Sequence, residues 1–137
     1  MVQEVVHDPI LLSRPSQPAT LADLTTAQDL VDTLRANKDA CVGMAANMIG
    51  VCTRVIVFYN KGIYMTMFNP EILKASGPYE AQESCLSLLG GPRPCKRYQT
   101  IKVQWHNAQF QTRVQTFTGL TAQIIQHEID HCNGILI

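Results

Sequence analysis

The stretch that decides the fold is QIIQHEIDHCNG, residues 123–134, which contains His127-Glu128-Ile129-Asp130-His131. The spacing of apolar residues predicts a helix from Leu120 to Asn133, with Gly134 as its C-terminal stop. Positions four apart on a helix differ by about 40° in azimuth, so both imidazoles project toward one point. This H-E-x-x-H pattern is typical of a site where two histidines bind a metal and the glutamate acts on water.

Two histidines do not complete a catalytic metal site, which usually has three protein ligands and one open position. Only six residues follow His131, and Cys132 points about 100° away around the helix, so we expect the third ligand upstream. Candidate ligands are the upstream cysteines, two histidines and one glutamate: Cys41, Cys52, Cys85, Cys95, His7, His106 and Glu83. Thiolate binds zinc and iron strongly, which favours the cysteines, but spacing alone does not select one.

Length and composition limit the classes of protein that this chain can belong to. The 137 residues predict a single domain, 1–137, and 46% hydrophobic residues exclude a disordered chain. Eleven basic residues balance eleven acidic ones, which provides no global field for nucleic acid or an anionic membrane. Five cysteines without a CxxC pair, and no signal peptide or membrane span, predict a cytoplasmic protein.

Pattern and turn residues predict an α+β order of elements rather than alternating βαβ units. Thr20 and Asp23 form a capping pattern for a helix that extends to residues 36–38, and residues 9–18 should be extended. Four strands are expected to form two hairpins, the first of them ended by Asn69-Pro70; the strands are 51–59, 63–68, 98–105 and 110–117.

Three segments together resemble the peptide deformylase family. Residues 41–48, CVGMAANM, resemble its motif G-x-G-x-A-A-x-Q; residues 83–87, ESCLS, resemble E-G-C-x-S; and residues 127–131 match H-E-x-D-H completely. The segments occur in the family order, and the resemblance covers essentially the whole chain. It implies an α+β fold in which antiparallel strands surround the C-terminal helix that carries HEIDH.

The resemblance also implies a reaction and its catalytic residues. A metal-dependent hydrolase of this family removes the N-formyl group from the N-terminal formylmethionine of nascent peptides. By family resemblance, Cys85, His127 and His131 hold one divalent metal, with Fe(II) expected and zinc, nickel or cobalt able to replace it. Glu128 is then the general acid and base for amide hydrolysis. The backbone N–H of Leu86 is implied as a donor to the oxyanion.

Further residues are expected to bind the substrate, an N-formylmethionyl peptide. Leu120 and Ile124 lie on the metal-facing stripe of the helix and suit a methionine side chain, although both could equally be plain core. Val42 and Gly43 match family positions whose backbone pairs with the peptide as an added strand. The expected partners include a transient contact with the ribosome exit region, and the expected oligomeric state is a monomer.

Three residues depart from the family motifs. Met48 replaces the glutamine that donates to the oxyanion, Cys41 replaces the first glycine, and Ser84 replaces the glycine before Cys85. A donor from Ser84 or Asn47 could compensate for Met48. The alternative is a deformylase-like metalloprotein with weak activity or another N-acyl substrate. A zincin endopeptidase is disfavoured by the lack of a downstream ligand, and a structural metal site by the presence of Glu128.

Overall fold

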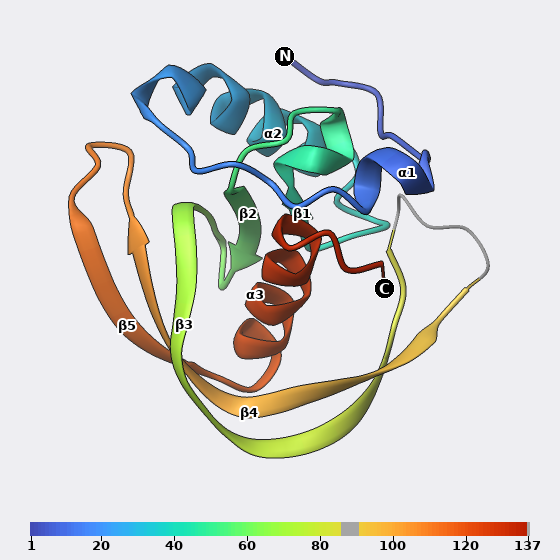
Figure 1. Ribbon diagram of the computed structural model, residues 1–137, viewed down its shortest axis with the longest axis vertical. Helices are drawn as coiled ribbons and strands as arrows, with labels where there is room; N and C mark the ends of the chain where they lie inside the picture. Colours follow the sequence, from blue (N-terminus) through green and yellow to red (C-terminus); the bar gives the residue numbers. More distant parts are fainter. Residues whose placement is uncertain (86–90, 137) are drawn as a thin grey trace.

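One curved antiparallel sheet forms the framework of the chain. The computed structural model describes residues 1–85 and 91–136. Its strands follow chain order across the sheet, β1-β2-β3-β4-β5, and each pairs antiparallel with its neighbour (Figure 1). Their bounds are β1 Gly43–Ala45, β2 Val55–Asn60, β3 Ile63–Glu83, β4 Arg93–His106 and β5 Thr112–Thr118.

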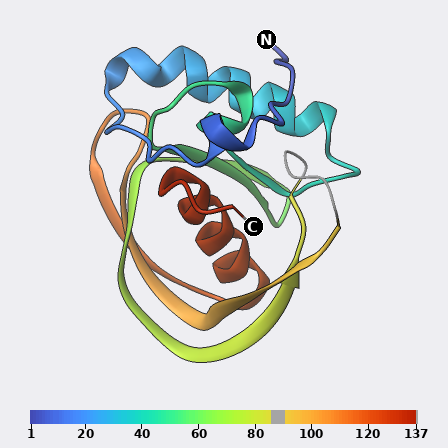
Figure 2. The same cartoon turned by 45° about the vertical axis from the view of Figure 1, so that its right-hand side comes forward.

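Helix α3, Gly119–Cys132, lies in the concave face of this sheet. Figures 1 and 2 show the long strands β3 and β4 curving around it. The helix packs on an apolar core that includes Phe58, Ile101, Val103 and Ile125. Alternation along β4 turns Ile101, Val103 and Trp105 inward, as expected from their period of two. The α+β fold with a central metal-motif helix is therefore confirmed.

The N-terminal part of the chain covers the other side of β1 and β2. It contains α1 Pro9–Leu12, the 3₁₀ turn η1 Leu21–Asp23, α2 Leu24–Ala36 and the 3₁₀ turn η2 Ala46–Ile49. Thr20 and Asp23 form the predicted capping box at the start of η1. Helix α2 buries Leu30 and Leu34 against a second core that includes Met44, Val57 and Phe68.

The prediction that Asn69-Pro70 ends the first hairpin is wrong. Strand β3 continues through this dipeptide, and a register shift between Phe68 and Glu71 absorbs the irregularity. Asn69 takes a left-handed conformation, with φ of 53°, and its side chain holds both backbone groups of Ala19. A bulge therefore accommodates a proline that would interrupt a regular ladder.

Smaller differences concern the ends of elements. Residues 9–18 are not extended throughout, because Asp8 caps a single helical turn in which Pro9 occupies the first position. Strand β2 begins at Val55 rather than residue 51, and β4 includes His106, which was expected in the turn. Gly134, with φ of 75°, follows α3 as expected. Within the described residues, none of the helices is long and apolar enough to cross a membrane.

Candidate metal centre

Helix α3 places the two motif histidines side by side, as predicted from their spacing. The Nε2 atoms of His127 and His131 lie 3.1 Å apart, and both side chains are buried. Ligand atoms about 2.0–2.1 Å from a tetrahedral metal would lie at a similar separation from each other. The two imidazoles are therefore arranged to share one ion.

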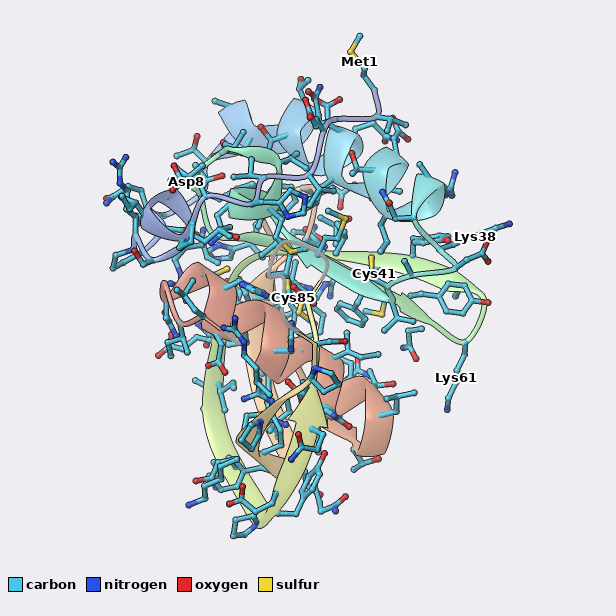
Figure 3. The ribbon with its side chains drawn as sticks, turned by 90° about the vertical axis from the view of Figure 1, so that its right-hand side faces the viewer. Met1, Asp8, Lys38, Cys41, Lys61 and Cys85 are labelled. Atoms are coloured by element: carbon cyan, nitrogen blue, oxygen red, sulfur yellow. The ribbon has the colours of Figure 1, made fainter. Side chains whose placement is uncertain are left out.

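The third candidate ligand comes from the residues that follow β3. Ligand atoms of Cys85, His127 and His131 all lie within 4.8 Å of one another. Figure 3 shows Cys85 beside α3, near the middle of the molecule. Among the described residues, this is the single group of three or more such side chains that could hold a metal, and the other candidate ligands from the sequence do not belong to it. One thiolate and two imidazoles form a donor set that fits a divalent transition metal.

Glu83 orients His127 instead of binding the metal. Its Oε1 accepts a hydrogen bond from Nδ1 of His127 at 2.7 Å, which leaves Nε2 free as a ligand. Arg97 binds the same carboxylate with two nitrogens and reaches Asp130 at 2.7 Å. Burial alone would raise the pKa of Glu83, but hydrogen bonds from His127 and Arg97 outweigh it and lower the pKa to about 2. The carboxylate is therefore charged.

The two histidines differ in their affinity for protons. Burial and the charge of His127 lower the pKa of His131 to about 3. Burial also opposes charge on His127, but the Glu128 carboxylate and the Glu83 hydrogen bond raise its pKa to about 10. In the absence of a metal, the proton between the two rings therefore belongs to His127. A metal ion must displace this proton in order to bind.

Glu128 lies next to the ligands without belonging to their group. The residue is 4% exposed, and its Oε1 has no hydrogen-bond partner among the described residues. Burial raises the pKa of this carboxyl to about 7. Such a group can accept and return a proton near neutral pH. Gly43 provides the space for it, because a Cβ there would lie 2.8 Å from Oε2 of Glu128.

A cavity of about 320 Å³ opens in front of the ligands. Cys85, His127 and Glu128 line it, together with all five residues predicted to bind the substrate: Val42, Gly43, Met48, Leu120 and Ile124. Leu120 is 68% exposed at the cavity wall, so the alternative that it is plain core does not hold. Leu86, the predicted oxyanion donor, lies outside the described residues.

The backbone of Gly43 faces an open sheet edge. Strand β1 pairs on one side with β2, where the N–H of Tyr59 donates to the carbonyl of Val42 at 2.8 Å. Gly43 opposite Phe58 is thus a non-hydrogen-bonded pair, and its own N–H and C=O point away from β2. The Gly43 N–H also hydrogen-bonds the Cys41 side chain, so a peptide that pairs with this edge would compete with that contact.

The three departures from the motifs have different surroundings. Cys41, Met48 and Ser84 all line the cavity. The Met48 side chain is buried, and its Sδ accepts the N–H of Ala45 at 3.4 Å. Asn47 does not line the cavity, because its amide donates to the carbonyl of His131 at 2.9 Å. Asn47 therefore is not placed to replace the missing donor.

Sequence reasoning missed the role of Gln123. This residue lies four positions before His127, so helical spacing would have placed it on the metal-facing side. Its Nε2 donates to Glu83 Oε2 at 2.9 Å, and the residue also lines the cavity. It therefore connects the cavity wall to the carboxylate that orients His127.

Comparisons with known proteins agree with this geometry. The sequence profile of the family described as polypeptide deformylase matches residues 3–137. The chain belongs to the polypeptide deformylase family. A peptide deformylase of Clostridium beijerinckii is 50% identical over 137 residues, which cover 100% of both chains. One from Dictyoglomus thermophilum is 32% identical and aligns with 100% of this chain and 91% of that protein.

Solved structures of deformylases share the fold. A peptide deformylase from Legionella pneumophila superposes with a TM-score of 0.90 and 31% identity, covering 99% of this chain and 83% of that chain. An actinonin-bound class I type b peptide deformylase from Acinetobacter baumannii superposes with a TM-score of 0.88 and is 29% identical in sequence. The match covers 99% of this chain and 95% of that chain. The enzyme class predicted from the sequence, a peptide deformylase that hydrolyses the N-formyl group, is thereby confirmed.

Proposed function

We propose that this chain removes the formyl group from N-formylmethionyl peptides with one divalent metal held by Cys85, His127 and His131. One observation carries the proposal: these ligand atoms lie within 4.8 Å of one another, and two of the ligands, Cys85 and His127, line the same cavity as the buried carboxyl of Glu128. The single domain 1–137 would be the catalytic unit. Fe(II) is the metal we expect, and zinc, nickel or cobalt suit the same ligands.

The protein's own groups divide the work of amide hydrolysis. A divalent cation, when bound, supplies Lewis acidity that lowers the pKa of water and polarises the formyl oxygen. Glu128 accepts the proton of the attacking water and returns it to the leaving amine. Glu83 keeps His127 in the tautomer that can bind a metal. The Leu86 N–H is the proposed donor to the developing oxyanion.

The peptide would bind along the open edge of β1. The N–H and C=O of Gly43 point away from β2 toward this edge, which suits strand addition next to Val42. Leu120 and Ile124 line the wall that would contact the methionine side chain. A structure of the Acinetobacter baumannii enzyme is described as bound to Met-Ala-Ser, and it is 28% identical to this chain with a TM-score of 0.88. The substrate would reach a cytoplasmic, monomeric enzyme from the ribosome exit region.

Replacement of Glu128 by alanine tests the proposal directly. Because Glu128 is not a ligand, Glu128→Ala should retain one metal per chain and lose at least about 10²-fold in kcat on formyl-Met peptides. Metal content by elemental analysis and formate release measure the two effects. Loss of the metal together with the carboxylate would place Glu128 among the ligands and contradict its role as a base.

A further inference from the structure

The metal-binding helix α3 has, besides Glu83, a second polar neighbour, which contacts its last turn. Asn47, in the turn η2, has an exposed fraction of 0%, as does His131. The amide Nδ2 of Asn47 donates to the backbone carbonyl of His131 at 2.9 Å. The two residues are 84 positions apart in the chain, so this contact ties η2 to the metal-binding turn.

The second ring nitrogen of His131 requires an acceptor. Nε2 of His131 faces Nε2 of His127, so Nε2 is the atom directed at the metal position. An imidazole that binds a metal through Nε2 carries its proton on Nδ1. This Nδ1 is buried and has no partner within residues 1–85 and 91–136. A metal-binding histidine almost always donates that N–H to an acceptor.

Asn47 has an acceptor oxygen that lacks a donor within the described part of the chain. This atom, Oδ1, is buried. Ser16 Oγ is a third buried polar atom without a hydrogen-bond partner among the described residues. Ser16 lies next to the end of α3, because its backbone N–H donates to the carbonyl of Cys132 at 2.8 Å. Buried polar atoms of this kind are usually joined by an internal water with two to four partners.

We propose that Asn47 is a positioning residue for the metal ligand His131. Its amide fixes the backbone of His131 directly, and its Oδ1 accepts, through one buried water, the hydrogen bond that starts at Nδ1–H. This arrangement would fix the ring orientation and tautomer of His131 and increase the basicity of Nε2. The inference rests on the proposed metal site, which it extends by one residue outside the cavity.

Zinc affinity, measured by competition with a chromophoric chelator, tests the role. Asn47→Leu has a similar volume but no polar atom, and it should bind zinc about 10–100-fold more weakly than the wild type. Asn47→Asp retains an acceptor oxygen and should lose less. Thr53→Val is the matched control, because it removes another buried, unpartnered hydroxyl that has no hydrogen bond to His131. It should bind zinc like the wild type.

¹⁵N NMR of the zinc-loaded wild type adds a second measurement, which requires no variant to fold. The imidazole shifts of His131 should show a protonated Nδ1 in slow exchange, with a cross-peak to a bound water. Zinc binding by Asn47→Leu within about 2-fold of the wild type, or an Nδ1–H bonded to another acceptor, would overturn the inference. Absence of zinc binding by the wild type would instead refute the metal site and this role with it.

Discussion

At the scale of single residues, Cys85 is the proposed ligand whose assignment depends most on the fold. Cys85→Ser replaces the thiolate by a weaker ligand and should lose the metal and the activity together. Cys95→Ser is the control, because Cys95 does not belong to the group of possible ligands. Elemental analysis of both purified variants measures this effect. Full metal content in Cys85→Ser with a metal-free Cys95→Ser would show that the wrong cysteine has been assigned.

Met48 stands where the family motif has a glutamine, and we expect this substitution to lower the rate. A glutamine at this position could keep the contact that Sδ makes with the Ala45 N–H, through Oε1, and direct its amide into the cavity. Met48→Gln should therefore raise kcat/KM on formyl-Met peptides about 10-fold or more, mainly through kcat.

Steady-state kinetics of Met48→Gln and the wild type, both loaded with the same metal, measure that change. The competing hypothesis is a cavity already satisfied by another donor such as Ser84, or adapted to another N-acyl group. An unchanged or lower kcat/KM would favour that alternative and refute the missing-donor explanation.

At the scale of elements, the close packing of β1 on α3 depends on a missing side chain. A Cβ on Gly43 would lie 2.8 Å from Oε2 of Glu128 and 2.9 Å from Cγ2 of Ile124. Gly43→Ala must therefore move the base or the strand, and kcat/KM should fall at least about 10-fold with a stability loss of about 1–3 kcal/mol.

Gly91→Ala is the control for Gly43→Ala, because its added Cβ would meet no atom of the described residues within 4 Å. Its positive φ of 82° should cost roughly 1 kcal/mol in unfolding free energy but leave kcat/KM unchanged. Urea unfolding and formate release separate the two effects. A Gly43→Ala enzyme with the wild-type rate would show that β1 is not closely fixed against the catalytic carboxyl.

At the scale of the whole molecule, the metal should connect segments that are far apart in the sequence. Cys85 follows the C-terminal end of β3, whereas both histidines belong to α3. A ligand that binds the folded state at 100 times its Kd stabilises it by about 2.7 kcal/mol. Removal of the metal should therefore lower Tm by roughly 5–10 °C for a domain of this size.

Differential scanning calorimetry of the metal-loaded and chelator-treated protein measures this shift, and reloading with zinc should restore it. The Cys85→Ser variant serves as a second reference, because its Tm should not respond to zinc. Equal Tm values for the loaded and metal-free wild type would indicate that the three ligands do not hold a common ion.

Much of the fold and site follows from local patterns in the sequence. The helical period alone places His127, Glu128 and His131 correctly, and the turn and cap residues around Thr20 and Gly134 predict the ends of helices. The alternation of Ile101, Val103 and Trp105 predicts which face of β4 is buried. These features depend on residues a few positions apart, so they can be interpreted without knowledge of the rest of the chain.

Only the tertiary structure decided the features that depend on distant residues. Spacing could not choose among the cysteines, and Cys85 is the one that the fold brings close to both histidines, because β3 ends beside α3. The bulge at Asn69-Pro70 exists because β4 and Ala19 provide partners for it, which outweighs the local tendency of Pro70 to break a strand. Arg97 joins Glu83 and Asp130 across three elements, because packing brings together charges that are up to 47 positions apart in the sequence, from 83 to 130.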